Sequence, residues 1–321
     1  MLAAAVLLAA VAANGTLVEQ APCPPYPNAA YDDYVAGAKK AHDEEAAAAQ
    51  REHHEMKTPL ALLTKEQYAQ RQKDAERVDC RHVKYMSDGL KVSGYIWKPM
   101  GAAGKLPLIV FNRGGNGDFG KALPWQNTWH FALDGFVVIA AQLRGSDGGE
   151  GKDEFGGADV DNVLNTIPLA ASLGDVDMRN IFLLGWSRGG METAIALKRG
   201  MKVNAAAVGG ALSDLHAELA RRPTLGTNVW RRLMPNYGEA ALRERSAIDW
   251  PERIRVPLLL IHGSADWRVD PAETQRFAEA LKRAGAMYEL VVYPGDDHGV
   301  SLHKDDSNRR IVQWFRWFMV R

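Results

Sequence analysis

Short apolar runs separated by polar, helix-capable stretches dominate the chain beyond residue 80. Runs at 107–111, 137–141, 181–184, 204–208, 257–261 and 289–293 have strand length and are rich in Val, Ile, Leu and Ala. Strands buried on both faces of a parallel sheet have this continuous apolar character, whereas half-exposed strands alternate. The pattern therefore predicts an α/β fold with a mostly parallel, twisted sheet flanked by helices.

Three further segments complete the predicted architecture. Runs at 83–86 and 91–97 flank Ser87-Asp88-Gly89, which predicts an antiparallel hairpin at the leading edge of the sheet. Residues 31–76 are rich in Ala, Glu, Lys and Gln and are predicted to be helical, either packing on the sheet domain or rimming its site. A helical insertion is expected over about residues 213–252, before the strand at 257–261. Four large side chains in it fit a substrate pocket and an ordinary core equally well: Trp230, Met234, Tyr237 and Trp250.

The strand at 181–184 leads into Gly185-Trp186-Ser187-Arg188-Gly189, and a helix-capable segment follows. Small residues around a serine between a strand and a helix are typical of a nucleophile elbow, in which the hydroxyl projects above the sheet. Ser187 is therefore a candidate nucleophile, and the amide of Arg188 is the candidate oxyanion donor that follows it.

A serine nucleophile needs a histidine base and a carboxylate that orients the base. Asp266 follows the strand at 257–261, and His298 follows the strand at 289–293. Both lie at the carboxyl ends of predicted parallel strands, in the chain order Ser, Asp, His that α/β-hydrolases use. Rival candidates remain. They are Asp270, which fits a helix N-cap before Pro271; Asp296 and Asp297, which fit a turn; and His262 and His303 as weaker bases.

Over roughly residues 80–320, these motifs resemble the catalytic domain of the prolyl oligopeptidase family of serine hydrolases, within the α/β-hydrolase fold. The resemblance rests on Gly185–Gly190, on Arg144-Gly145-Ser146, on His262–Val269 and on Tyr293–Gly299. It implies Ser187 as nucleophile, Asp266 as orienting acid and His298 as general base. Residues 1–79 are too few for the β-propeller that peptidase members usually carry.

The loop after the strand at 107–111 departs from that family. Its sequence is Arg113-Gly114-Gly115-Asn116, where the family often has His or Tyr before Gly-Gly-Pro. The second oxyanion donor is therefore open, with Gly114 and Gly115 as candidates. The Gly-x-Gly-x-x-Gly over 115–120 does not predict a dinucleotide site, because the next strand ends in Gln142-Leu143-Arg144 rather than an acid. Arg113 and Arg188 suit either an anionic substrate group or pairing with Asp118 or other nearby acids.

Composition narrows the classes of partner. The 321 residues carry 39 basic and 39 acidic side chains. Because the chain has no excess of positive charge, its composition does not predict binding to nucleic acid. Neither a cofactor fingerprint nor metal-ligand spacing is present, so no cofactor or metal is expected. The apolar stretch Leu2–Ala13 is too short to span a bilayer and ends near Ala10-Val11-Ala12, which predicts a signal peptide over 1–13.

Export would put the protein in a periplasmic or extracellular space, where Cys23 and Cys80 are able to form a disulfide. If residues 1–13 are not a signal peptide, the protein is expected in the cytoplasm. There the two cysteines would remain free thiols without a structural role. The expected organisation is this signal segment, then a linker and helical arm over 14–79, and a catalytic domain over 80–321.

The functional hypothesis is a serine hydrolase that cleaves acyl bonds through an acyl-enzyme. Its substrates are expected to be small esters or short peptides. The alternatives are a carboxylesterase of the same fold and a binding protein that retains the fold without turnover.

Overall fold

One mixed β-sheet organises the molecule. The computed structural model describes residues 12–126 and 128–321. Within them, nine strands form a sheet in the order β1-β2-β3-β5-β4-β6-β7-β8-β9. The strands are β1 (Leu17–Pro22), β2 (Val78–Ser87), β3 (Leu90–Pro99), β4 (Leu106–Asn112), β5 (Val137–Ala141), β6 (Val176–Trp186), β7 (Ala205–Gly209), β8 (Leu258–Gly263) and β9 (Tyr288–Tyr293). From β5 to β9 all neighbours are parallel, whereas β1, β2 and β3 pair antiparallel and join β5 through β3.

The predicted mostly parallel sheet is confirmed, and its strands are buried as their composition predicted. Every residue of β5, β7 and β8 is buried. The edge strand β9 is only partly buried, with Glu289 exposed. Because the central strands are covered on both faces, the apolar side chains form two cores, one on each side of the sheet.

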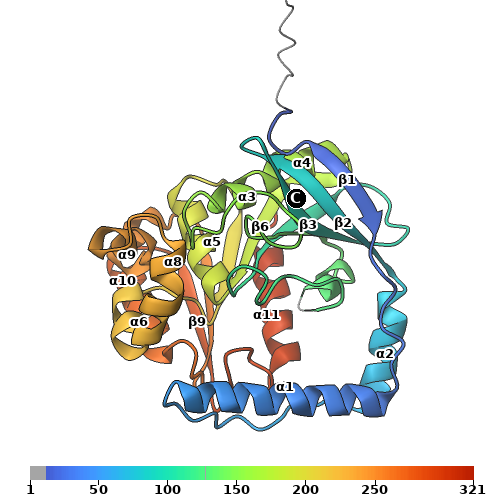
Figure 1. Cartoon of the computed structure of the whole chain (residues 1–321). Helices are drawn as coiled ribbons and strands as arrows, with labels where there is room; N and C mark the ends of the chain where they lie inside the picture. Colours follow the sequence, from blue (N-terminus) through green and yellow to red (C-terminus); the bar gives the residue numbers. More distant parts are fainter. Residues whose placement is uncertain (1–11, 127) are drawn as a thin grey trace, which may run out of the picture.

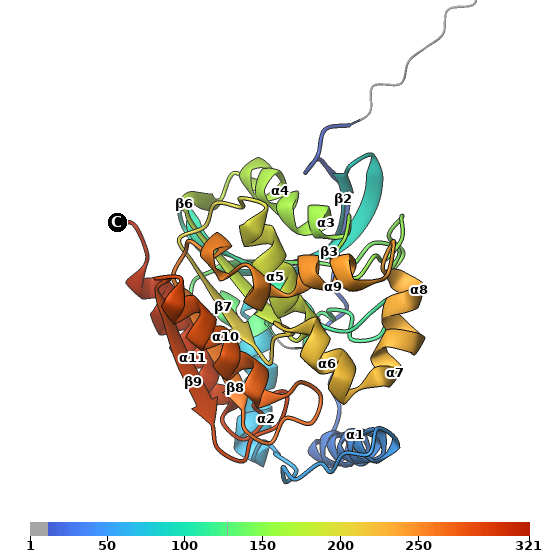
Figure 2. The same ribbon diagram turned by 90° about the vertical axis from the view of Figure 1, so that its left-hand side faces the viewer.

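Helices cover both faces of the sheet (Figures 1 and 2). One core takes side chains from α3, α4, α5 and α10, and the other from η1 and α11. The helices of the described residues are α1 (Tyr31–Arg51), α2 (Lys65–Ala75), η1 (Trp129–Ala132), α3 (Val160–Leu164), α4 (Thr166–Leu173), α5 (Arg188–Lys198), α6 (Leu215–Arg221), α7 (Pro223–Leu225), η2 (Gly226–Trp230), α8 (Arg231–Leu233), α9 (Glu239–Arg245), η3 (Ala247–Asp249), η4 (Pro251–Arg253), α10 (Pro271–Arg283) and α11 (Lys304–Trp317). Short helices from α6 to η4 occupy the expected insertion between β7 and β8.

Two expectations about the amino-terminal region were wrong. The β2–β3 hairpin is not the edge of the sheet, because β1 pairs with β2 outside it. The helix predicted over 31–76 is two helices separated by residues 52–64, a connection that contains Pro59. A capping box starts the second: Thr64 accepts a hydrogen bond from the Gln67 amide, and the Gln67 side chain accepts one from the Thr64 amide.

The amino-terminal segment is joined to the sheet covalently as well as by strand pairing. Cys23, just after β1, forms a disulfide with Cys80 of β2, whose pairing the sequence left open. The predicted signal segment 1–13 lies, except for its last two residues, outside the described part of the chain. No helix within 12–126 and 128–321 has the combination of length and apolar character needed to span a membrane.

Candidate active site

Ser187 lies in the sharp turn between β6 and α5, with φ 59° and ψ −126°. A non-glycine residue adopts a positive φ only at a strain cost, and such outliers gather at functional sites. The neighbouring glycines make the turn sterically feasible. A Cβ on Gly185 would collide with Thr193, and one on Gly189 with the Asn112 carbonyl. The close approach of α5 to β4 and β6 therefore requires glycine at both positions.

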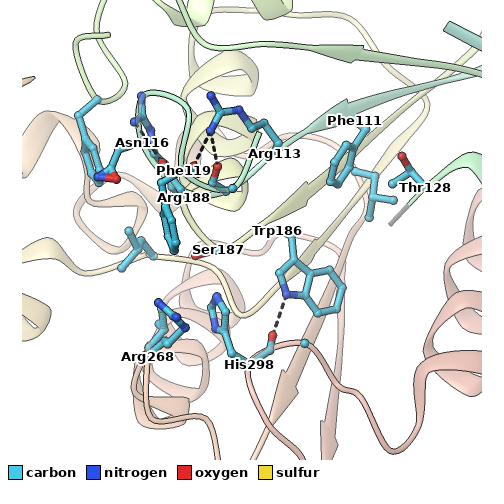
Figure 3. A pocket seen from close by; sticks show the side chains of 18 of the residues that line it. Phe111, Arg113, Asn116, Phe119, Thr128, Trp186, Ser187, Arg188, Arg268 and His298 are labelled. Atoms are coloured by element: carbon cyan, nitrogen blue, oxygen red, sulfur yellow. Dashed lines mark hydrogen bonds between the residues drawn. The ribbon is translucent and has the colours of Figure 1, made fainter. Parts of the chain in front are cut away.

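His298 and Asp266, which are 32 positions apart in the sequence, meet beyond the ends of β8 and β9. The imidazole Nδ1 lies 2.7 Å from Asp266 Oδ2. The His298 carbonyl accepts a hydrogen bond from Trp186 Nε1 at 2.7 Å, which ties the histidine loop to the residue before Ser187. In Figure 3 the ring of His298 points toward Ser187, between Arg268 and Trp186. The three predicted residues thus come together at one place.

Asp266 is 5% exposed, and its two oxygens have separate sets of donors. Oδ1 accepts the backbone amides of Arg268 and Val269 at 2.8 and 3.0 Å, while Oδ2 faces both His262 and His298. Burial by itself would raise the pKa of Asp266, but the charge of His298 and the hydrogen bonds from both histidines hold the pKa well below its usual range. Asp266 is consequently a carboxylate throughout the range in which a histidine base works.

His262 is the residue whose contribution the sequence understated. It is fully buried at the end of β8, with Nε2 2.9 Å from Asp266 Oδ2 and 3.2 Å from the Val269 carbonyl. A carbonyl only accepts hydrogen bonds, so Nε2 carries the proton and Nδ1, 2.6 Å from Thr274 Oγ1, accepts from that hydroxyl. His262 therefore contacts Asp266 from inside the fold and, unlike His298, does not line the cleft that contains Ser187.

The remaining rivals all have structural tasks. Asp270 caps α10 by accepting the Ala272 amide at 3.0 Å. Asp296 is fully buried and accepts both the amide and Nδ1 of His303, while Asp297 accepts the amides of Gly299 and Ser301. His303 and Asp296 thus form a second His–Asp pair, but His303 does not line the cleft that contains Ser187.

The loop after β4 brings glycine backbone against Ser187. A Cβ placed on Gly114 would lie 3.0 Å from the Ser187 Cβ and 3.5 Å from its Oγ. Gly115 has a φ of 73° and leads into a tight turn in which Asn116 pairs with Phe119. The buried guanidinium of Arg113 donates to the carbonyls of Gly114 and Phe119 at 3.0 Å each, and to the Gly117 carbonyl. Arg113 therefore holds the loop from inside rather than facing a substrate.

The side chain of Arg188 is likewise engaged in contacts within the protein. Its guanidinium is 2% exposed and pairs with Asp153, Asp159 and Glu192 at 2.5–2.8 Å. It also donates to the Gly115 carbonyl at 3.2 Å. Neither Arg113 nor Arg188 is available to an anionic substrate group, and neither pairs with Asp118 in the described chain. The side chain of Arg188 instead links the elbow to the glycine loop, because Asp153 also accepts the Gly117 amide.

Ser187 and His298 line a cleft of about 390 Å³ that extends to both sides of Ser187 (Figure 3). On one side is the cap lobe, lined by Phe119, Phe155, Arg222, Leu225, Trp230 and Arg268. On the other is the α11 lobe, lined by Phe111, Thr128, Trp186, Lys304, Asn308 and Ile311. The cleft therefore offers space on both sides of Ser187.

Only one aromatic residue of the predicted insertion reaches the cleft. Trp230 lines the cap lobe and lies 5.9 Å from Phe155, centroid to centroid. Met234 and Trp250 are buried in the core instead. Trp186, which precedes Ser187, also lines the cleft. Lys304 and Asn308 were missed because they belong to a polar helix face whose neighbours are distant in the sequence.

Helix α1 lies across the lower end of the molecule in the view of Figure 1. Glu45 forms a bidentate ion pair with Arg268, with oxygens 2.6 and 2.5 Å from Nε and Nη2. In the connection that follows α1, the Thr58 hydroxyl donates to the carbonyl of Gly295, three residues before His298. The amino-terminal arm thus contacts both the rim of the cleft and the histidine loop.

Comparison with known proteins gives two family matches. The model of the prolyl oligopeptidase family matches residues 123–320, and that of the acetyl xylan esterases matches residues 50–167. A Bacillus subtilis protein named uncharacterized peptidase YtmA is 30% identical over 239 residues, which cover 72% of this chain and 91% of that protein. Dipeptidyl aminopeptidase BIII of Pseudoxanthomonas mexicana is 25% identical over 60% of this chain, but only 30% of its own length is covered.

Solved structures agree on the fold. An acylaminoacyl peptidase from Pyrococcus horikoshii superposes with a TM-score of 0.66 at 23% identity, over 77% of this chain and 43% of that one. A puromycin-hydrolyzing peptidase from Mycobacterium tuberculosis gives 0.63 at 24% identity, over 74% and 39%. The chain therefore has an α/β-hydrolase fold and spans less than half the length of these larger peptidases.

Proposed function

Because this chain belongs to the prolyl oligopeptidase family of serine hydrolases, we propose that Ser187 is its nucleophile, His298 its general base and Asp266 the acid that orients the base. The observation that carries the proposal is the 2.7 Å contact between His298 Nδ1 and Asp266 Oδ2, at a cleft that Ser187 and His298 both line. In this arrangement Nδ1 donates to the carboxylate, which leaves Nε2 free to accept a proton.

The reaction follows from these positions. His298 takes the Ser187 proton as Oγ attacks the acyl carbon, and the imidazolium that forms is stabilised by the Asp266 carboxylate. The same proton passes from His298 to the departing alcohol or amine. Water then attacks the acyl-enzyme, again with His298 as base, and the free acid leaves.

Oxyanion stabilisation comes from the turn and the glycine loop in this proposal. The amide of Arg188 stands at the first turn of α5, where helix amides have no intrahelical acceptor. The Gly114–Gly115 backbone lies against Ser187 on the other side and supplies the second donor. Each such donor contributes about 10²–10³ in kcat.

Short peptides and small esters are the proposed substrates. The support for peptides is the peptidase names among the relatives, and the support for esters is the acetyl xylan esterase match over residues 50–167. The contact of α1 with Arg268 narrows the approach to the cap lobe, which favours small substrates over folded proteins.

The test is hydrolysis of p-nitrophenyl butyrate and of alanyl-p-nitroanilide by wild type, Ser187→Ala and Ser301→Ala. Ser301 is exposed and close to His298 in the chain, so it is the matched control. We expect Ser187→Ala to lose ester and amide turnover, and its labelling by a fluorophosphonate, while Ser301→Ala keeps all three. Turnover of the ester alone would make the protein an esterase. Equal activity of wild type and Ser187→Ala would refute the assignment, and inactivity of both would favour a binding protein.

We also propose that the protein is exported. The disulfide between Cys23 and Cys80 supports an oxidising compartment, where such bonds persist. Fractionation of producing cells tests this: we expect the processed, oxidised protein outside the cytoplasm, and reduced full-length protein in the cytoplasm would contradict it.

A further inference from the structure

The α11 lobe contains a cation that the proposed reaction does not use. Lys304 is the first residue of α11, and its ammonium lies 4.6 Å from the centre of the Trp186 ring. Its Nζ has one hydrogen bond, 3.3 Å long, to the Gly299 carbonyl. No carboxylate within residues 12–126 and 128–321 forms an ion pair with it. This position is unfavourable for a lysine, because the amino terminus of a helix carries partial positive charge.

Two neutral polar groups share the lobe with Lys304. Thr128 is 4% exposed, and its Oγ1 is buried without a hydrogen-bond partner among the described residues. Asn308 lies one helical turn after Lys304, so both side chains stand on the same face of α11. A buried hydroxyl without a partner destabilises the fold, and a bound acceptor would remove that penalty. The remaining walls are apolar and include Phe111 and Ile311.

The cap lobe differs, because its cations are already engaged. Arg268 pairs with Glu45, and Arg222 donates to the Arg268 carbonyl and lies within 4 Å of Glu52 and Glu218. Of the other cations that line the cleft, Arg113 is engaged by backbone carbonyls, and Arg188, Arg222 and Arg268 by carboxylates. Lys304 has only its 3.3 Å hydrogen bond to Gly299 within the described chain. A negative group placed beside it would be favoured by the ammonium, the Thr128 hydroxyl and the end of α11 together.

We propose that the α11 lobe binds a carboxylate carried on one arm of the substrate, with Lys304 as its cation and Thr128 as a second donor. The inference rests on the function proposed above and specifies its substrate class as esters or peptides with a free carboxylate near the scissile bond. One ammonium with neutral donors matches a single negative charge, and the apolar walls accommodate the carbon chain that links the carboxylate to the reacting carbonyl.

The charge of Lys304 makes this preference depend on pH. Burial is the largest influence on the lysine and lowers its pKa to about 8, against the opposing charges of Asp297 and Asp296 in the preceding loop. Arg71 of α2 and His130 of η1 are the other groups facing it. Burial lowers the pKa of His130 to about 3, so that ring is neutral throughout the working range. The preference should thus be present at pH 7 and decline as the pH rises through 8 toward 9.

Paired esters test the proposal by turnover. p-Nitrophenyl hydrogen glutarate and its methyl ester place the charge on the acyl arm, and 3-acetoxybenzoate and its methyl ester place it on the leaving arm. For one of these two pairs, we expect wild type at pH 7 to have a kcat/KM about ten- to a hundredfold higher for the charged ester than for its methyl ester. Lys304→Met should lose this preference for the charged member, whereas the exposed-lysine control Lys282→Met should keep it. The inference fails if neither series shows a preference, or if the preference survives Lys304→Met.

Binding separates this inference from the proposed function. We expect 4-phenylbutyrate to bind wild type and Ser187→Ala about ten- to a hundredfold more tightly than Lys304→Met in calorimetry, with 4-phenylbutanamide unaffected. Lys304-dependent binding without any Ser187-dependent turnover would sustain the subsite and reject the hydrolase. Ser187-dependent turnover of neutral esters, with no effect of Lys304→Met on carboxylate binding, would sustain the hydrolase and reject the subsite.

Discussion

Four carboxylates lie within a few residues of the histidine loop or the end of β8, and their surroundings distinguish them. Asp266 alone has one oxygen held by two backbone amides while the other faces His298. Asp270, Asp296 and Asp297 accept amides of their own turns. An acid that orients a catalytic histidine must be ionised and fixed, and the donors around Asp266 satisfy both needs.

Asp266→Asn should lower kcat/KM for p-nitrophenyl butyrate by about 10⁴, because an amide NH₂ facing His298 favours the wrong tautomer. Asp270→Asn is the matched control, since asparagine caps a helix as well as aspartate does. We expect Asp270→Asn to retain wild-type kinetics and stability. Steady-state kinetics on both variants checks this, and the opposite ranking would transfer the orienting role to Asp270.

Glu192 is a second residue whose ionisation matters, here for stability. It is buried against Arg188, Asp153 and Asp159. Burial, together with the two neighbouring aspartates, raises its pKa to about 8 in spite of Arg188. The folded protein therefore holds a proton there that the unfolded chain releases near its ordinary pKa of 4.5. This contribution to stability is complete below pH 4.5 and is lost as the pH rises to 8.

Glu192→Gln should weaken the fall in the free energy of unfolding between pH 5 and pH 9, since glutamine stays neutral and can still accept from Arg188. The difference between the two proteins should amount to about 1.4 kcal/mol for each unit of pKa shift realised. Urea unfolding at pH 5, 7 and 9 measures it, with the exposed Glu279→Gln as control. Parallel pH profiles for wild type and Glu192→Gln would mean that Glu192 is ionised in the fold.

At the scale of elements, the turn between β6 and α5 depends on backbone contact that only glycine permits. The Gly189 Cα lies under the Asn112 carbonyl at the end of β4, so a methyl group there would force α5 away from the sheet. The same helix begins at Arg188, whose amide is the proposed oxyanion donor. The close contact at Gly189 therefore constrains both the packing of α5 and the geometry of the site.

Gly189→Ala should cost about 1–3 kcal/mol of stability through overpacking and reduce esterase activity with it. Gly37→Ala is the reference substitution, because Gly37 lies exposed within α1 with nothing within 4 Å of its added Cβ. We expect Gly37→Ala to stabilise the protein by about 0.5–1 kcal/mol, as glycine is a poor helix former. Urea unfolding of both variants decides the matter; a neutral Gly189→Ala would show that α5 can shift freely.

At the scale of the whole molecule, β1 and the disulfide secure the arm that carries α1. Cys23 and Cys80 are 57 positions apart, and the loop they close includes α1 and α2. Cross-linking a loop of this length removes freedom mainly from the unfolded chain. The arm is in turn joined to the rim of the cleft by Glu45 and Arg268.

The double variant Cys23→Ser/Cys80→Ser should lose about 4 kcal/mol of stability, the chain-entropy value for such a loop. A reducing agent should destabilise wild type by a similar amount and leave the double variant unchanged. Urea unfolding with and without reductant makes the comparison. Insensitivity of wild type to reductant, with both thiols reactive, would indicate that the cysteines do not pair.

Local features let the sequence predict much of the fold and the proposed triad. Strand length, apolar composition and the glycines around Ser187 act on neighbouring residues, so the sheet and the elbow were both predictable. The same holds for the order of Ser187, Asp266 and His298 along the chain. The break at residues 52–64 also had a local signal, Pro59 and the Thr64 capping box, which outweighs helical composition.

Only the tertiary structure decided what depends on contacts between distant residues. Edge strand β1 is short and mostly exposed, so its sequence has no buried periodicity, and its place was set by β2 and the disulfide. His262 reaches Asp266 because β8 ends where the loop turns back, and Lys304 faces Trp186 across a cleft. Whether a charge is paired, buried or free is a property of its neighbours in space. The sequence by itself therefore determined most of the elements and the candidate nucleophile. Packing decided the surroundings of Asp266, the two lobes and the lack of a carboxylate partner for Lys304 among the described residues.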